Sequence, residues 1–167
     1  DDAVELARVA NNIVKEDFVS NAIDSREFTF EILPGTMQSK VTLVWTDEEG
    51  DWKSWLALKN DLDLEVVSPS GRVYYPYNLP VNLTIAGATP AGSLCTTTIG
   101  SNITSGCRDR RNNVEMAPLF PINGNLVLEN GTWKARVNVS RLVSNSQDFS
   151  LVIGPKCPVI ITSNTIL

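Results

Sequence analysis

The chain of 167 residues has 14 Lys and Arg residues against 19 Asp and Glu residues, a net charge of −5, and no histidine. The acidic balance argues against nucleic-acid binding, and the missing histidine removes the usual general base of serine, cysteine and zinc hydrolases. No apolar run is long enough to cross a membrane, while the apolar content of 43% suffices for the core of one ordinary domain.

The sequence contains no further motif that would indicate catalysis or nucleic-acid binding. The chain contains neither a G-x-S-x-G elbow nor a P-loop. Asp61 and Asp63 would be about 7 Å apart on one strand, whereas a glycosidase pair must flank the sugar from opposite sides. The densest basic cluster, residues 108–111, is short and is interrupted by an acid. We therefore expect no catalysis by this chain and no nucleic-acid ligand.

Residues 1–17 differ from the rest of the chain. Their apolar side chains follow a helical spacing, at Leu6, Val9, Ala10, Ile13 and Val14. This spacing predicts a short amphipathic helix or a linker that docks on a neighbouring surface, followed by one domain over residues 18–167.

Alternation with a period of two dominates the sequence after residue 17. In residues 40–46, for example, Val41, Leu43 and Trp45 are expected to face inward. Asn130-Gly131 is expected to form the turn of a hairpin. Alternating or apolar runs occur at residues 27–32, 40–46, 61–66, 73–75, 113–116, 126–128, 133–139, 149–153 and 159–161. About eight strands without helix-length patterns between them predict an all-β fold, an antiparallel β-sandwich or jelly roll.

Residues 76–112 interrupt this rhythm with a long segment that is rich in Gly, Ser and Thr. Long loops of this kind are usually functional or disordered. Cys95 and Cys107 lie in this segment, and a disulfide between them would close a short loop and restrain it. Cys157 is left without a predicted partner in the chain.

Four N-x-S/T sequons indicate N-glycosylation and, with the predicted disulfide, a secreted or secretory-pathway protein. Asn82 and Asn102 fall in the long loop, Asn130 in a turn, and Asn138 on the polar face of a strand. All four positions are compatible with exposure to solvent.

An acidic stretch provides candidate ligands for a hard cation. Asp61, Asp63 and Glu65 are expected to project to the same side of one strand, where a cation such as Ca²⁺ would relieve their repulsion. Further oxygen ligands could come from Asp47, Asp109, Asn112, Asn113 and Glu115. The alternative is an ordinary polar strand face that Lys and Arg side chains balance.

Several sequence blocks, in this order, resemble the β-jelly-roll domain that follows the catalytic domain of certain subtilisin-like serine proteases. The blocks are VTLVWTD at 41–47, LKNDLDLE at 58–65 with PSG at 69–71, NNVE at 112–115, GTWKARV at 131–137 and QDFSLVI at 147–153. Together they cover roughly residues 25–154, and the N-D-L-D-L core is their most specific part.

The resemblance implies a domain that packs on the protease catalytic domain, supports its folding and stability, and in several members binds Ca²⁺. Asp61, Asp63, Asn113 and Glu115 match acidic and amide positions of the motif. The catalytic Asp, His and Ser of the family would lie upstream of this chain. The segment 76–112 departs from the compact family pattern and suggests a eukaryotic secreted member.

A second class of function stays open at this point. Jelly rolls often bind carbohydrate or protein as free-standing modules. Aromatic side chains that could stack on a sugar are Trp52, Trp55, Tyr74, Tyr75 and Tyr77. A sugar platform needs these rings exposed, whereas an interdomain contact needs a partner to bury them.

Overall fold

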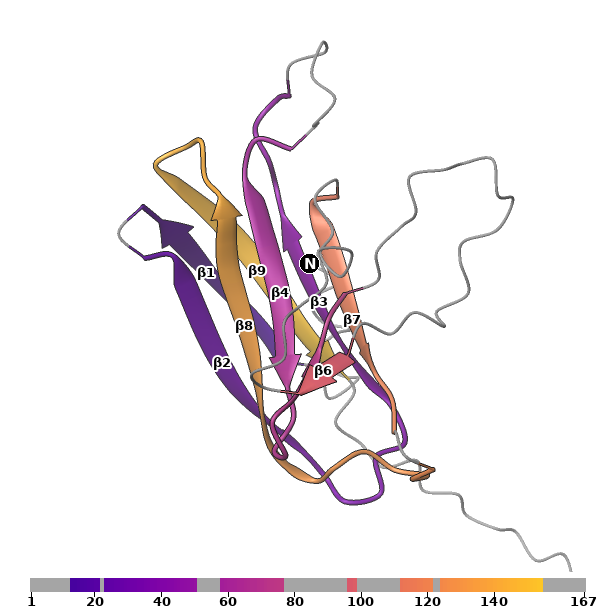
Figure 1. Ribbon diagram of the computed structural model, residues 1–167. Coiled ribbons are helices and arrows are strands. Elements are labelled where there is room, and N and C mark those ends of the chain that lie inside the picture. Colours follow the sequence, from indigo (N-terminus) through magenta and orange to yellow (C-terminus); the bar gives the residue numbers. More distant parts are fainter. Residues whose placement is uncertain are drawn as a thin grey trace, which may run out of the picture.

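The computed structural model describes residues 13–21, 23–50, 58–76, 96–98, 112–121 and 124–154, which form two facing antiparallel sheets (Figure 1). One sheet has four strands in the order β1-β9-β3-β7, and the other has five in the order β2-β8-β4-β5-β6. The all-β antiparallel sandwich that the alternation predicted is therefore confirmed.

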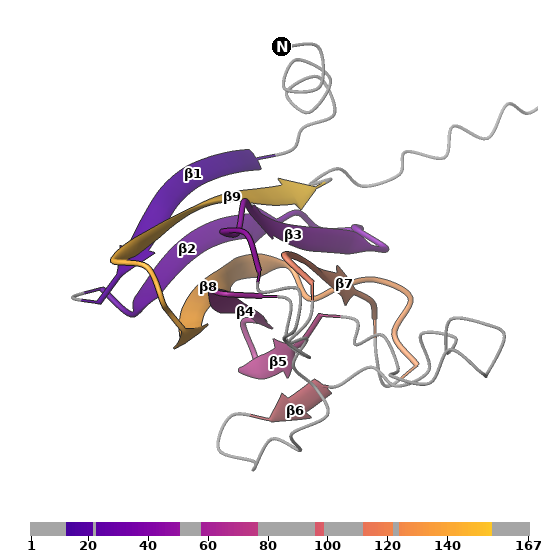
Figure 2. The same cartoon turned by 90° about the horizontal axis from the view of Figure 1, so that it is seen from above.

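The strands that the structure describes run as follows: β1 Ile13–Ser20, β2 Ser25–Ile32, β3 Ser39–Trp45, β4 Asp61–Val67, β5 Arg72–Tyr74, β6 Thr96–Thr98, β7 Val114–Leu119, β8 Gly131–Arg141 and β9 Ser146–Gly154. Along the chain, β1, β3, β7 and β9 belong to one sheet and β2, β4, β5, β6 and β8 to the other. The chain thus crosses repeatedly between the layers, as the view from above shows (Figure 2).

The core between the sheets follows the predicted alternation. Val41, Leu43 and Trp45 of β3 are 0–2% exposed, as expected from their spacing. Trp133 on β8 is fully buried, and its ring lies 5.4 Å from that of Tyr74 on β5, centroid to centroid. Between the layers, the ring of Phe28 on β2 lies 6.1 Å from that of Phe149 on β9, so aromatic side chains pack both within the five-stranded sheet and across the sandwich.

Three local predictions are corrected by the structure. Residues 13–17, predicted as helix or linker, lie in β1, because Ile13–Ser20 pair in register with β9. Residues 126–128 form no strand. Residues 126 and 127 are bends, and the Leu128 amide donates to the Thr36 carbonyl over 2.8 Å. The predicted hairpin turn at Asn130-Gly131 is therefore absent: Gly131, at φ 119°, starts β8, and β8 pairs with β2 and β4. The described residues include no helix, and so none that could cross a membrane.

Two charged side chains tie the sheets together along their two sides. On one side, Arg26 of β2 donates from Nε to the Phe18 carbonyl of β1 over 2.9 Å and lies 3.3 Å from the Asp17 carboxylate. On the other side, Glu115 of β7 accepts a hydrogen bond from the Leu64 amide of β4 over 2.6 Å. Each link satisfies a backbone group at the border of a sheet, where no described strand pairs with it.

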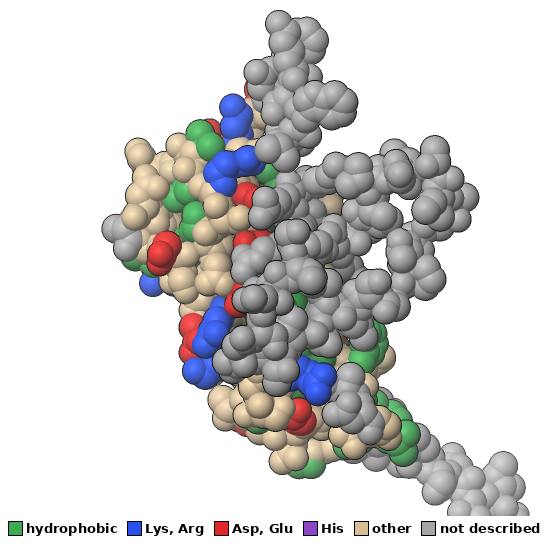
Figure 3. Space-filling model, in the orientation of Figure 1, with side chains coloured by type: hydrophobic (Ala, Val, Ile, Leu, Met, Phe, Trp, Pro, Cys, Tyr) green, Lys and Arg blue, Asp and Glu red, His purple; other side chains and the backbone are tan. Residues whose placement is uncertain are grey.

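Charges of both signs are mixed on the face of the five-stranded sheet that Figure 3 presents. Glu27 of β2 lies 2.9 Å from Lys134 Nζ and 2.7 Å from Arg136 Nε, both on the neighbouring strand β8. Hydrogen bonds from Lys134 and Arg136 hold the pKa of Glu27 below its ordinary value of 4.5. This outer face is therefore locally neutralised by its own cross-strand pairs.

We expect the Tyr74 hydroxyl to remain protonated in the folded chain well above pH 10. Burial raises the pKa of Tyr74 from 10.0 to about 12, and the hydroxyl donates to the Phe120 carbonyl. Because the neutral form is favoured, its contribution to the free energy of unfolding is full below pH 10 and is lost as the pH rises through about 12.

The measurement is a near-ultraviolet absorbance titration of the wild type and of Tyr74→Phe. The difference between the two curves isolates this group among the three tyrosines of the chain. A transition centred near pH 10 in the difference curve would contradict the burial of the hydroxyl.

Candidate functional site

The N-D-L-D-L motif begins with Asn60, whose side chain takes part in four hydrogen bonds. This residue is 0% exposed and directly precedes β4 at one end of the sandwich. A buried amide without partners would be costly, so its surroundings must supply two acceptors for its nitrogen and donors for its oxygen.

The surroundings supply all of these partners. Asn60 Nδ2 donates to Ser144 Oγ and to Gln147 Oε1, both over 2.8 Å. Asn60 Oδ1 accepts from the Val143 amide over 2.8 Å and from the Ser144 amide over 3.2 Å. One side chain therefore fixes the whole connection between β8 and β9 against the start of β4.

The backbone of the same segment is held by β3 and by the residues that follow it. Trp45 Nε1 donates to the Asn60 carbonyl over 3.1 Å. The two oxygens of Asp47 accept from the backbone amides of Lys59, over 2.6 Å, and of Asn60, over 2.9 Å. Arg141, at the end of β8, donates to the carbonyls of Leu58 and Lys59. The segment 58–60 is thus fixed from both sheets.

Gln147 of β9 completes the arrangement, which we call the Asn60 network. Gln147 Nε2 donates to the Thr46 carbonyl over 3.0 Å and to the Asp148 carbonyl over 2.8 Å, while its oxygen accepts from Asn60. Gln147 is only 7% exposed. The network therefore joins β3, β4, β8 and β9 at one end of the sandwich, and it uses residues from three blocks of the family motif.

Asn113 and Glu115 also act on backbone groups. Asn113 Nδ2 donates to the Trp45 carbonyl over 2.8 Å, and the Asn113 carbonyl accepts from the Trp45 amide over 3.1 Å. Glu115, which is 1% exposed, is the cross-sheet link to Leu64. These two residues hold β7 against β3 and β4.

The structure does not bring the predicted calcium ligands together as one set. Asp61 and Asp63 are 4% and 2% exposed on β4, whereas Asp47 is used by the backbone of residues 59–60. Within the described ranges, no three Asp, Glu or Cys side chains are grouped closely enough to hold a metal ion. Calcium binding by these residues therefore stays a prediction.

Other sequence predictions divide between described and undescribed residues. Asn130 is exposed before β8, outside any turn, and Asn138 is half-buried on β8 between Ser25 and Asp63, on a strand as predicted. Tyr74 and Tyr75 are 2% and 4% exposed, so neither belongs to an exposed sugar platform. Predicted residues outside the described part of the chain are Trp52, Trp55, Tyr77, Asn82, Cys95, Asn102, Cys107, Asp109 and Cys157.

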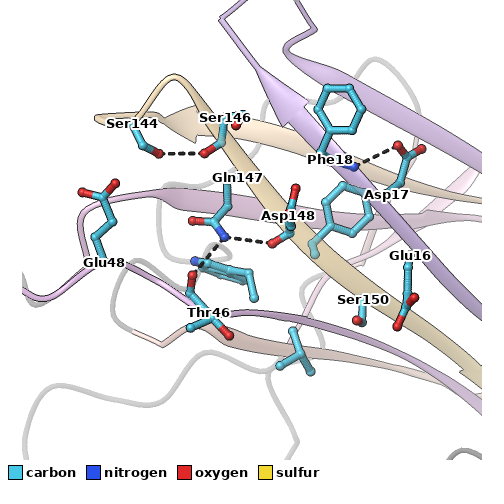
Figure 4. A pocket seen from close by; sticks show the side chains of 13 residues that line it. Glu16, Asp17, Phe18, Thr46, Glu48, Ser144, Ser146, Gln147, Asp148 and Ser150 are labelled. Carbon is cyan, nitrogen blue, oxygen red and sulfur yellow. Dashed lines mark hydrogen bonds between the residues drawn. The ribbon is translucent and has the colours of Figure 1, made fainter.

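A groove of about 720 Å³ crosses the outside of the four-stranded sheet beside the Asn60 network (Figure 4). Phe18 of β1 and Val44 of β3 form its apolar parts, with Ser146 and Ser150 of β9 between them. Glu16, Asp17, Glu48 and Asp148 add carboxylates, and no Lys or Arg among the described residues lines the groove. Sequence reasoning missed this surface, although an acid and two serines at outward positions of one strand were visible in residues 146–150.

The groove and the network can bind and position, but the described residues contain no arrangement for hydrolysis. The chain has no histidine, and the Ser144 hydroxyl accepts from the Asn60 side-chain amide and donates to the Ser146 carbonyl. Activation of a serine nucleophile requires an adjacent general base.

No family model and no curated protein matches the chain. Among solved structures, the chain is similar to the CspB protease of Clostridium perfringens, with 11% identity and a TM-score of 0.43. The similarity covers 88% of this chain and 26% of that chain, so this chain spans about a quarter of the length of the clostridial protein.

Proposed function

We propose that the chain is a non-catalytic β-sandwich domain of a secreted subtilisin-like serine protease, where it packs against the catalytic domain and supports its stability. The proposal combines the ordered sequence blocks with the role of their residues in the fold. Its consequence is that this chain acts by holding and contacting a partner, while the peptide-bond chemistry belongs to other residues.

The observation that carries the proposal is the use of the motif residues inside the sandwich. Trp45, Asp47, Asn60, Asn113 and Gln147 come from four separate blocks, and hydrogen bonds join them at one end of the two sheets. A motif of this kind specifies an architecture rather than a reaction. The resemblance is therefore supported by hydrogen bonds that join the separate sequence blocks in the folded domain.

The composition of the chain agrees with a non-catalytic role. A subtilisin-like serine protease uses a histidine as general base, and this chain has none. The alternative of a free-standing carbohydrate-binding module loses two of its five proposed stacking residues, because Tyr74 and Tyr75 are buried. A protein partner therefore explains more of the described residues than a glycan does.

Sequencing of the complete transcript that encodes the chain tests the proposal directly. We expect the same reading frame to encode a subtilisin-like domain, with its catalytic Asp, His and Ser, on the N-terminal side. We also expect the purified chain to cleave no casein. A reading frame without such a domain, or proteolysis by the pure chain that a serine-protease inhibitor blocks, would contradict it.

The Asn60 network should account for much of the stability of the domain. Asn60→Ala removes a buried side chain that accepts from the backbone amides of Val143 and Ser144 and donates to the side chains of Ser144 and Gln147. We therefore expect a loss of about 2–4 kcal/mol in the free energy of unfolding. In a domain of this size, the melting temperature would fall by roughly 5–15 °C. Asn60→Asp should also destabilise, because it places a carboxylate beside Gln147 Oε1 in a buried position.

The matched control is Asn145→Ala, an exposed asparagine in the same connection between β8 and β9. Its effect on the free energy of unfolding should stay within about 0.5 kcal/mol, as for most surface substitutions. Equal melting temperatures for Asn60→Ala and Asn145→Ala would show that the network does not stabilise the fold.

Calcium binding is a further part of the proposal, and it rests on the acidic stretch of β4 and on the family resemblance. We expect the wild type to melt at a higher temperature in millimolar Ca²⁺ than in chelator or in millimolar Mg²⁺, and Asp63→Asn to lose this difference. An ion at a hundred times its dissociation constant adds about 2.7 kcal/mol to the free energy of unfolding. Identical melting in all three solutions would remove calcium from the proposal and leave Asp63 as a buried structural residue.

A further inference from the structure

The register of three strands produces the groove on the outside of the four-stranded sheet. Ser150 of β9 pairs with Glu16 of β1 on one side and with Val44 of β3 on the other. One step along the sheet, Asp148 pairs with Phe18. Because larger side chains flank Ser150 on the central strand, the outer surface is hollowed at this point of β9.

The shape of the groove suits an extended polypeptide segment. The lining residues of β9 and its preceding turn run from Ser144 to Ser150, a distance of about 20 Å in extended chain. Strand β9 is paired on both sides, with β1 and with β3. Its backbone can therefore add no further strand, and a bound segment must be recognised by side chains.

The charge of the groove is one-sided. Glu16, Glu48 and Asp148 are exposed, and within the described part of the chain none of them has an ion-pair partner. Asp17, the other carboxylate of the groove, is already paired with Arg26. This contrasts with the outer face of the five-stranded sheet, where Lys134 and Arg136 neutralise Glu27. Carboxylates of one sign along a hollow favour a cationic ligand.

The groove also offers apolar contact. Phe18 is 42% exposed and Val44 is 37% exposed, although both lie on strands whose inward side chains fill the core. The Arg26 guanidinium lies 5.1 Å from the centroid of the Phe18 ring and fixes its position. An ordered aromatic ring beside an aliphatic side chain can hold an apolar residue of a ligand with little loss of entropy.

We infer that this groove binds an extended segment of a protein partner in which Lys or Arg side chains flank an apolar side chain. The cationic groups pair with Glu16, Glu48 and Asp148, and the apolar side chain packs between Phe18 and Val44. Arginine suits these carboxylates best, because its guanidinium can donate two parallel hydrogen bonds to one carboxylate. This inference goes beyond the proposed function and holds whichever polypeptide supplies the segment.

The test measures binding of a fluorescein-labelled peptide, Arg-Leu-Lys-Val-Arg-Leu, to the full chain by fluorescence anisotropy at low salt. The acidic counterpart, Glu-Leu-Glu-Val-Glu-Leu, serves as the control ligand. We expect saturable binding of the basic peptide only, weakened several-fold by physiological salt because the pairs are exposed. Absence of saturable binding, or equal binding of the acidic peptide, would overturn the inference.

Two triple variants separate the groove from the general acidity of the chain. Glu16→Gln with Glu48→Gln and Asp148→Asn should weaken binding at least tenfold and leave the melting temperature unchanged, since all three side chains are exposed. The matched control, Asp24→Asn with Glu31→Gln and Glu49→Gln, removes the same charge outside the groove and should change the affinity less than twofold. Equal losses in both variants would mean non-specific attraction and would overturn the inference.

A single variant tests the location independently of the acidic groups. Ser150→Arg places a long cationic side chain between Glu16 and Val44, in the hollow itself, and should also reduce the affinity at least tenfold. Unchanged affinity in a folded Ser150→Arg protein would place the peptide elsewhere and overturn the inference.

Discussion

A single buried amide holds one end of this sandwich together. Asn60 is fully buried, and its side chain bonds to the connection between β8 and β9 while its backbone bonds to Trp45 and Asp47. Because β3 and β9 belong to one sheet and β4 and β8 to the other, these bonds set the relative position of the layers at this end. Hydrophobic burial favours contact between the sheets, but it is not directional. The Asn60 side chain supplies directional contacts, because its nitrogen and oxygen find their hydrogen-bond partners in only one relative position of the strands.

The network also explains why acidic and amide residues in the sequence resembled ligands. Calcium and backbone amides are both bound by carboxylate oxygens, so Asp47 and Glu115 have suitable chemistry for either. Which partner each one meets depends on the pairing of distant strands. Asp47 lies opposite the amides of residues 59–60, and Glu115 reaches Leu64 only because β7 faces β4 across the sandwich. No local pattern contains this information.

The same distinction separates what the sequence predicts well from what it does not. Alternation predicted the inward faces of residues 40–46 and 133–139, because side chains on a strand point to opposite sides in turn. The local pattern was misleading at residues 13–17, where Ile13 and Val14 fit a helical spacing but pair with β9 in the fold. It failed again at residues 126–128, whose backbone bonds to the 33–36 turn instead of to a strand. In both places, tertiary contacts outweighed the local pattern.

Strand β9 connects the structural and the binding roles of the domain. Its inward residues Gln147 and Phe149 join the Asn60 network and the core, while its outward residues Asp148 and Ser150 line the groove. The Gln147 amide group bonds to the Asp148 carbonyl, so the network fixes the backbone from which the groove carboxylate projects. A groove held in this way loses little conformational entropy when a ligand binds. The alternation of one strand thus gives a single sequence block two functions, one on each face of the sheet.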